Sequence, residues 1–462
     1  MSFSYEEFLT TKLKTVQKSG FKISDSLLSK TLKPHQEYTV KFLCDIGKGG
    51  GFLDTGLGKS LVMLNVADAI VKTENMPFLI LTPLAVAYQM KKESEKFGFD
   101  AQIIRSSKEI NGNKIYISNY EMLKNINPDD FIGVALDESS ILKNFAGATK
   151  QFIVKAFKNT KYKFSFSATP SPNDYVEFGN QAEFLNVSTQ KEMLANWFVN
   201  DLGNTADWRL KKHAEDDFFL WLASWGVYVS KPSDLGFSDD GYILPPLHEI
   251  YHEVKTDDLP PSDGSLFRMV ELAASNLHKE KRLTAQRRCE KVKELLPDDY
   301  CLIWCDTNYE ADILKELIPN AYELRGDDKP EKKEELLIGF GNGDFKHLIT
   351  KSSIAGMGLN YQNCNNTIFT GLNYSYESYY QSIRRFWRFG QTREVTAHII
   401  GADSETATFQ TITEKKDAHQ KLKDKMSQTI SSSQNRREIN CNLGNEIVRV
   451  PNWLKQNITK KD

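Results

Sequence analysis

The feature that most constrains the fold of this chain is the segment Gly51–Ser60, which reads Gly-Phe-Leu-Asp-Thr-Gly-Leu-Gly-Lys-Ser. It follows a glycine-rich stretch and precedes a run compatible with a helix. Glycines let backbone N–H groups approach phosphate oxygens closely, and a helix that begins beside them directs its positive end at the anion. The segment therefore predicts a phosphate-binding loop in an α/β fold.

The end of this loop carries the two side chains that a triphosphate site needs. Lys59 can reach the β- and γ-phosphates, and the Ser60 hydroxyl suits Mg²⁺. The general pattern G-x-x-x-x-G-K-[S/T] has a glycine where Leu53 stands here. Taken alone, the loop leaves open a glycine-rich turn with an incidental Lys-Ser pair.

Two carboxylates, Asp137 and Glu138, follow the apolar run Phe131–Leu136. Such a run predicts a buried parallel strand, and α/β sheets place ligands at the carboxyl ends of their strands. Asp137 can hold Mg²⁺, and Glu138 can orient or deprotonate the attacking water. A solvated acidic pair is the alternative, and the presence of Lys59 upstream argues against it.

Arginines cluster late in the chain, at Arg384, Arg385 and Arg388, after Gln381. We expect them on one helix, where residues i and i+3 share a face, so that Arg385 and Arg388 point at one target. An arginine finger stabilises charge on a transferring phosphoryl group. The distance from Lys59 along the sequence implies that a second lobe supplies them. A basic surface helix is the alternative, and the intervening aromatic residues argue against it.

With these residues in place, the chain resembles the superfamily-two helicases and, within them, the Swi/Snf-type DNA translocases. The resemblance runs from about Leu32 to about Ala402. In the first half its motifs are Leu32-Lys-Pro-His-Gln36, Asp54–Ser60, Leu81–Gln89, Ile117–Leu123, Asp137–Asn144 and Ser167-Ala-Thr-Pro170. In the second half they are Cys301-Leu-Ile-Trp-Cys-Asp306, Ser352–Asn360 and Gln381–Gln391. The chain departs from the family at Ser139-Ser140, where Ala-His is usual, and at Arg384, where a small residue is common.

The resemblance implies a role for each matching residue. The catalytic residues would be Lys59, Asp137, Glu138, Arg385 and Arg388. ATP would contact Gln36, Thr55, Gly56, Leu57, Gly58, Lys59, Ser60, Gly356 and Gln381, and Mg²⁺ would contact Ser60 and Asp137. DNA, double-stranded by the resemblance, would contact Thr82, Pro83, Asn119, Lys143, Asn144, Ser352 and Asn360.

The implied fold is two tandem RecA-like lobes with parallel sheets flanked by helices, plus a helical insertion. We expect an N-terminal helix and linker over residues 1–30, lobe 1 over 31–244 with a helical protrusion at about 175–230, lobe 2 over 245–415, and a partly flexible extension over 416–462. Within that extension, 431–435 is expected to be loose and 450–454 to offer an apolar anchor. The alternation of apolar runs with helical segments supports parallel sheets independently of the resemblance.

Two groups of residues in the expected helices have roles that the sequence leaves undecided. Aromatic residues recur at helical spacing between Gln190 and Trp225, which favours a packed core over base stacking. Basic residues between Ala274 and Leu296 are expected on a solvated helix face, with DNA contact as the alternative.

The composition favours a globular protein over a membrane-spanning or a secreted one. The chain of 462 residues has 40% hydrophobic and 26% charged residues, and it shows neither a membrane-spanning run nor a secretory leader, so a cytoplasmic location is expected. The compact size without reader domains favours a bacterial or infected host cell, and we expect a monomer. The six cysteines are scattered, and Cys301 and Cys305 are expected to pack as small apolar residues of a strand instead of binding zinc. A net charge of −2 limits any DNA contact to a local basic stripe.

Two other functions stay open. The first is a strand-separating DNA or RNA helicase, and the second is an ATP-binding switch or scaffold. The partner that would recruit a translocase is not specified by the sequence.

Overall fold

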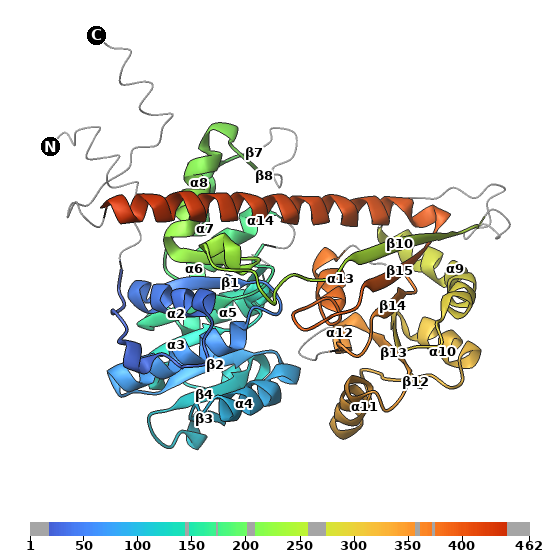
Figure 1. Ribbon diagram of the computed structural model, residues 1–462, viewed down its shortest axis with the longest axis horizontal. Coiled ribbons are helices and arrows are strands. Elements are labelled where there is room, and N and C mark those ends of the chain that lie inside the picture. The colour runs from blue at the N-terminus through green and yellow to red at the C-terminus, as the bar shows by residue number, and fades with distance from the viewer. Residues whose placement is uncertain are drawn as a thin grey trace, which may run out of the picture. The chain divides into compact units, whose positions relative to one another are not determined.

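The computed structural model describes residues 18–143, 147–171, 174–200, 208–256, 274–355, 361–371 and 375–440. Two compact units divide the chain: unit 1 is Met1–Asp239 with Gln420–Asp462, and unit 2 is Asp240–His419. Each contains a sheet covered by helices (Figure 1). The expected helix before Lys18 and the apolar anchor at 450–454 lie outside the described residues. Among the described residues, no helix combines the length and apolar character that crossing a membrane requires.

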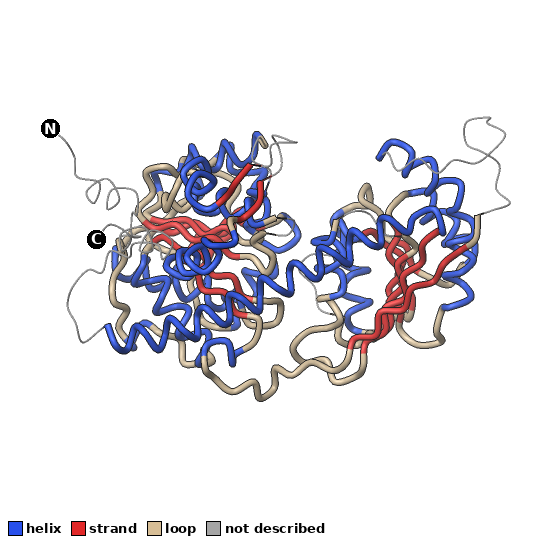
Figure 2. The backbone as a smooth tube through the Cα atoms, turned by 90° about the horizontal axis from the view of Figure 1, so that it is seen from above, coloured by secondary structure: helices blue, strands red, loops and turns tan. Residues whose placement is uncertain are grey.

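Unit 1 is built on a seven-stranded sheet in the order β3-β4-β2-β5-β6-β1-β9, and every neighbouring pair is parallel. Its strands are β1 (Lys48–Leu53), β2 (Phe78–Thr82), β3 (Ala101–Ile103), β4 (Ile115–Asn119), β5 (Gly133–Leu136), β6 (Tyr162–Phe166) and β9 (Gly226–Val229). The main helices around it are α2 (Pro34–Ile46), α3 (Lys59–Glu74), α4 (Ala87–Lys96) and α5 (Ala148–Ala156). Helices lie on both faces of the strands (Figure 2), which is the doubly covered arrangement that parallel sheets require.

Strand β1, which lies between β6 and the edge strand β9, contains three successive glycines because neighbouring groups occupy the space of their side chains. A Cβ at Gly51 would lie 2.4 Å from the Phe166 ring, and one at Gly49 would lie 2.7 Å from the carbonyl oxygen of Trp225. The strand is fixed by pairing with β6 and β9 on its two sides. The glycines thus bring aromatic side chains close to the strand that leads into the phosphate-binding loop.

The insertion after Pro170 forms helices α6 (Phe178–Phe184), α7 (Gln190–Trp197) and α8 (Glu215–Trp225), together with the antiparallel hairpin β7 (Phe198–Asn200) and β8 (Trp208–Leu210). Its aromatic residues pack with one another, and Phe218 and Trp225 are fully buried, which confirms the prediction of a core. The predicted protrusion differs at its end, since 226–229 is strand β9 of the main sheet.

Unit 2 contains a six-stranded parallel sheet in the order β10-β15-β14-β11-β13-β12. The strands are β10 (Leu247–Val254), β11 (Cys301–Cys305), β12 (Tyr322–Glu323), β13 (His347–Lys351), β14 (Asn366–Phe369) and β15 (Val395–Ala402). The helices are α9 (Ala274–Leu295), α10 (Asn308–Leu317), α11 (Pro330–Asn342), α12 (Ser352–Ala355) and α13 (Tyr376–Ile383). Cys301 and Cys305 are buried in the core on β11, as predicted.

The basic helix α9 is not simply a solvated face. Arg288 is fully buried, and its guanidinium lies 2.7 Å from the Glu310 carboxylate. Lys281 is also buried and donates to Asp306 at 2.6 Å. The expectation of a solvated helix was therefore wrong at these two positions, because acidic partners on neighbouring segments compensate the buried charges.

The chain ends, within the described residues, in the long helix α14 (Thr406–Asn440). Residues 431–435 belong to this helix, so the expectation of a loose serine-rich segment was wrong. The helix contains neither glycine nor proline, so no residue in it breaks the hydrogen-bond pattern.

The buried Lys163 on β6 gives a testable dependence of stability on pH. Burial, and then the neighbouring Lys48, lower the pKa of Lys163 to about 7, although its ammonium donates to Asn186 Oδ1 at 3.0 Å. The unfolded chain keeps this proton to about pH 10.4, so unfolding takes up a proton between these values and wild-type stability rises with pH. Lys163→Met removes the buried charge, so this variant is expected to be the more stable at pH 7.

That stability advantage is expected to shrink by about 1.4 kcal/mol per pH unit above pH 7. Urea unfolding at pH 7, 8 and 9 measures it. The exposed Lys155 on α5 offers a matched control, and Lys155→Met should show a constant difference from the wild type. A constant difference for Lys163→Met as well would show that the buried amine is not perturbed.

Candidate functional site

The phosphate-binding loop follows β1 and leads directly into α3, which begins at Lys59. Gly56 has φ 93° and Gly58 has φ 79°, both in the left-handed region that favours glycine. Gly58 is the N-cap of α3, so the first N–H groups of the helix are directed toward the loop. Of the other predicted loop residues, Thr55 directly precedes Gly56, and Ser60 is the second residue of α3.

Gln36 on α2, predicted to contact ATP, packs against this loop. Its Nε2 donates to the carbonyl oxygen of Leu57 at 2.9 Å, and its Oε1 accepts from the backbone N–H of Lys33 at 2.8 Å. A Cβ added at Gly58 would lie 2.1 Å from Gln36 Nε2. The loop can therefore carry no side chain at Gly58 while Gln36 holds this position.

The two carboxylates after β5 lie beside the lysine of the loop. Lys59 Nζ donates to Glu138 Oε1 at 3.0 Å and lies 3.9 Å from Asp137 Oδ1. The parallel sheet explains this meeting, because β1 and β5 both pair with β6 and end at the same edge. The structure thus brings together three predicted catalytic residues that are separated by about 80 positions in the chain.

The surroundings of Asp137 change the pKa of its carboxyl group. Burial raises the pKa of Asp137 to about 6; the ammonium of Lys59 opposes this rise, and the carboxylate of Glu138 adds to it. Tyr120 donates to the backbone carbonyl of Asp137 at 2.6 Å and fixes the turn. Glu138 has φ 49°, a left-handed conformation that is uncommon for a residue with a side chain and that recurs at functional sites.

Gln181 on α6 connects the segment after the carboxylates to Ser167–Pro170. This buried side chain donates from Nε2 to the carbonyl oxygens of Ser139, at 3.0 Å, and Pro170, at 3.4 Å. Sequence reasoning missed it, because Gln181 lies in a short helix of mixed composition that carries no motif. Gln181 joins the two segments at the position where the Ser139-Ser140 departure from the family occurs.

The predicted DNA-contacting residues of unit 1 lie at the carboxyl ends of β2 and β4 and after β5. Thr82 is buried and donates to the carbonyl oxygen of Pro83 at 2.8 Å. Asn119 accepts from two N–H groups of the helical turn that follows it, at 3.1 Å each. Lys143 is exposed. Asn144 lies outside the described residues.

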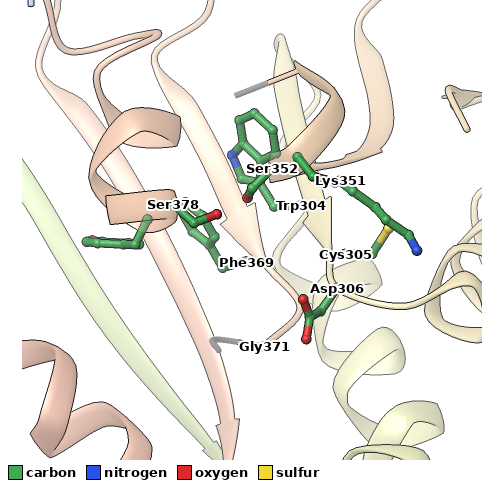
Figure 3. A pocket seen from close by; sticks show the side chains of 10 residues that line it. Trp304, Cys305, Asp306, Lys351, Ser352, Phe369, Gly371 and Ser378 are labelled. Atoms are coloured by element: carbon green, nitrogen blue, oxygen red, sulfur yellow. The ribbon is translucent and has the colours of Figure 1, made fainter. Parts of the chain in front are cut away.

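In unit 2, Ser352 begins α12 and lines a small cavity of about 80 Å³ at the carboxyl ends of β11, β13 and β14 (Figure 3). Its hydroxyl is hydrogen-bonded to Ser382 at 3.0 Å. Lys351 and Asp306 also line this cavity. The predicted residues Gly356 and Asn360 lie outside the described residues.

The arginines follow α13 instead of sharing its face, so the predicted helix through Arg388 was wrong. The helix ends at Ile383, and residues 384–390 form turns. Phe386 is fully buried against Trp304, and this packing takes the chain off the helical path. Gln381 stays on the last turn of α13, and Arg385 is mostly buried.

Arg384, which stands where the family has a small residue, also lies in this buried segment. Its guanidinium lies over the rings of Tyr380 and Trp387, at 5.6 and 5.0 Å from the ring centroids. Cation–π contacts with two aromatic rings explain how a large, charged side chain is accommodated there.

In the described ranges, His, Cys, Asp and Glu side chains form no cluster of three or more that could hold a metal ion. A magnesium ion bound to ATP needs only one or two carboxylates, because phosphates and waters supply the other oxygens. Ser60 and Asp137 fit this requirement. The closely packed glycine loop and Lys59 fit a triphosphate in the same way.

Two family models match the chain. One, described as "Type III restriction enzyme, res subunit", matches residues 30–172, and the other, described as "Helicase conserved C-terminal domain", matches residues 287–390. Together they cover more than half of the chain, and they span the loop, both carboxylates and the arginines. The chain belongs to the superfamily-two helicases. It is accordingly a nucleic-acid-dependent ATPase with two RecA-like lobes.

A comparison of this helicase with curated proteins found no match. Among solved structures it is similar to the Sulfolobus solfataricus SWI2/SNF2 ATPase core in complex with dsDNA. The identity is 18%, the TM-score is 0.41, and the match covers 84% of this chain and 90% of that chain.

Proposed function

We propose that this helicase is an ATP-dependent translocase of the Swi/Snf type, which moves along double-stranded DNA and remodels protein–DNA or branched DNA structures. The observation that carries the proposal is the position of the Lys59 ammonium between Glu138 and Asp137 at the carboxyl edge of the unit 1 sheet. Hydrolysis of a bound triphosphate requires a lysine for the phosphates and carboxylates for Mg²⁺ and the attacking water, and this group places all three side chains together.

Each residue of this group has a separate task. Lys59 would hold the terminal phosphates, and Ser60 and Asp137 would hold Mg²⁺. Glu138 would orient the attacking water and accept its proton, once its contact with Lys59 is replaced by one with that water. When bound, ATP with Mg²⁺ supplies the phosphoryl group and the cation that neutralises it. Gln36 lies against the loop and would recognise the base.

In unit 2, Arg385 and Arg388 would stabilise the charge that develops on the phosphoryl group, and Gln381 would contact the nucleotide. The DNA track would follow the carboxyl ends of the strands in each sheet. Its contacts in unit 1 would be Thr82, Pro83, Asn119, Lys143 and Asn144, and its contacts in unit 2 would be Ser352 and Asn360. Lys351 and the hydroxyls at the unit 2 cavity are suited to a DNA phosphate.

The near-neutral net charge of the chain supports DNA binding that is weak enough to be released in each ATPase cycle. With 59 basic and 61 acidic residues, the protein has no global attraction to DNA. Binding then depends on a few local phosphate contacts and weakens steeply with added salt.

The ATPase rate in the presence of different polymers tests the proposal. We expect double-stranded DNA to stimulate turnover strongly, and single-stranded DNA or RNA to stimulate it little. Displacement of a triplex-forming strand should accompany this turnover, while a plain duplex stays paired.

Two other outcomes of that assay would contradict the proposal. Stimulation by single strands with separation of a forked duplex would favour a strand-separating helicase. A rate that no polymer changes would favour an ATP-binding switch.

A further inference from the structure

Asp54 stands directly before the phosphate-binding loop and is held on several sides. Its backbone N–H donates to the carbonyl oxygen of Val229 on β9 at 2.8 Å. Its carboxylate Oδ1 accepts from the backbone N–H of Thr55 at 2.7 Å. Only 6% of the side chain is exposed, so the charge of this carboxylate is largely removed from water.

The other oxygen of this carboxylate contacts a lysine from the C-terminal part of the chain. Lys423 Nζ on α14 donates to Asp54 Oδ2 at 2.8 Å, and 9% of the lysine side chain is exposed. The two residues are 369 positions apart in the chain and both belong to unit 1. A buried lysine thus balances a buried carboxylate at the start of the loop.

The surrounding face of α14 is docked on unit 1 independently of this ion pair. Leu422 and Met426 are buried on either side of Lys423. Ser427 donates to Asp234 Oδ1 at 2.7 Å, and Asp234 Oδ2 accepts from two backbone N–H groups in the turn that follows β9. Leu422 and Met426, like Lys423 and Ser427, are four residues apart, so the two pairs form one broad face of the helix.

We infer that Lys423 is a positioning residue of the nucleotide site, through which the C-terminal helix α14 sets the affinity of the phosphate-binding loop for ATP. Asp54 lies two residues before Gly56, so an unbalanced carboxylate there would repel the phosphates of a bound nucleotide. Lys423 removes this repulsion, and the Asp54 carboxylate that it holds also fixes the Thr55 N–H. The inference rests on the proposed binding of ATP to this loop, and it does not depend on the choice of polymer.

Replacement of the lysine by a neutral side chain of similar length tests this role. In Lys423→Met, we expect the Kd for a fluorescent ATP analogue to rise roughly tenfold, the size expected for one uncompensated charge several ångströms from the phosphates. The KM for ATP should rise in the same proportion, while kcat at saturating ATP changes less than about threefold. Lys423→Arg keeps the charge and should bind nearly as well as the wild type.

A double-mutant cycle separates this role from a general loss of structure. Asp54→Asn alone should change the Kd less than about threefold, since it removes the repelling charge. Adding Asp54→Asn to Lys423→Met should therefore restore the affinity that Lys423→Met loses. Lys425 gives a matched control on the same helix, because it lies 3.7 Å from Glu215 and is partly exposed. Lys425→Met should bind ATP normally.

The melting temperature of each variant is measured beside the Kd. An unchanged Kd in Lys423→Met, or an equal rise in Lys423→Met and the double variant, would overturn the inference and leave Lys423 as a stabilising contact. A wild-type protein that binds no ATP analogue would instead contradict the proposed function itself.

Discussion

A Glu138→Gln variant is expected to bind ATP with near-normal affinity while its turnover falls by about 10²–10⁴-fold. Glutamine keeps the size of the side chain and can still contact the loop, but it cannot accept a proton from water. Lys59 loses one carboxylate at 3.0 Å and keeps Asp137 at 3.9 Å, so its charge remains partly balanced. Single-turnover hydrolysis and the Kd for an ATP analogue, each measured with duplex DNA present, provide the two quantities.

The matched control is Glu121→Gln, since Glu121 is exposed in the turn after β4 and has no proposed role. This variant should hydrolyse ATP at the wild-type rate. A turnover in Glu138→Gln within tenfold of the wild type would show that another group activates the water. Asp137 would then be the first residue to test.

Some strands of the two sheets were predictable because each is a short apolar run that the structure buries completely. The strand predicted over Phe131–Leu136 contains β5, and the one predicted at Cys301 and Cys305 coincides with β11. Both strands lie inside their sheets, where each has a parallel neighbour on either side. Burial on both faces requires apolar side chains at every position, and this leaves a clear local signal.

The strands that the sequence analysis missed depend on tertiary contacts. Three successive glycines in Lys48–Leu53 resemble a turn, yet they form β1 because aromatic side chains fill the space beside them. Strand β9 was assigned to the protrusion, since the aromatic helix before it continues the same apolar pattern. Neither sheet position can be derived from local propensity alone.

The centre of the candidate site was predictable for a topological reason. Lys59 and Glu138 each follow a strand of one parallel sheet, and such strands end at a common edge. The partners of this centre were not predictable in the same way. Gln181 contacts the segment after the carboxylates, and Lys423 contacts Asp54 before the loop. Both lie on helices whose docking depends on the packing of whole elements, and their local sequences contain no motif that marks a contact.

The path of the chain around the arginines shows how packing overrides helical periodicity. Spacing alone favoured a helix that carries both Arg385 and Arg388. The structure ends the helix at Ile383, and Phe386 enters the core beside Trp304 and Tyr361. Burial of this aromatic ring compensates for the helical hydrogen bonds that the turn gives up.

An Arg388→Ala variant is expected to fold normally, to bind ATP within about threefold of the wild-type affinity, and to lose about 10³-fold or more in turnover. The turn that carries Arg388 is fixed by other residues, since Phe386 is fully buried and Trp387 Nε1 donates to the carbonyl oxygen of Pro245 at 2.7 Å. Loss of the guanidinium therefore removes charge from the site without removing the support of the turn. Steady-state hydrolysis with saturating duplex DNA measures the effect.

The matched control for this variant is Arg393→Ala, because Arg393 is exposed and its guanidinium lies 3.2 Å from the Asp299 carboxylate. An exposed ion pair contributes little to stability, so this variant should keep both its fold and its turnover. If both alanine variants lose turnover equally, the loss would come from the lower positive charge of unit 2 and not from a specific role of Arg388. If Arg388→Ala instead hydrolyses ATP normally, no arginine finger acts from this position, and Arg385 becomes the remaining candidate. A loss confined to Arg388→Ala, with ATP affinity retained, would mean that its guanidinium acts mainly on the charge that develops during phosphoryl transfer.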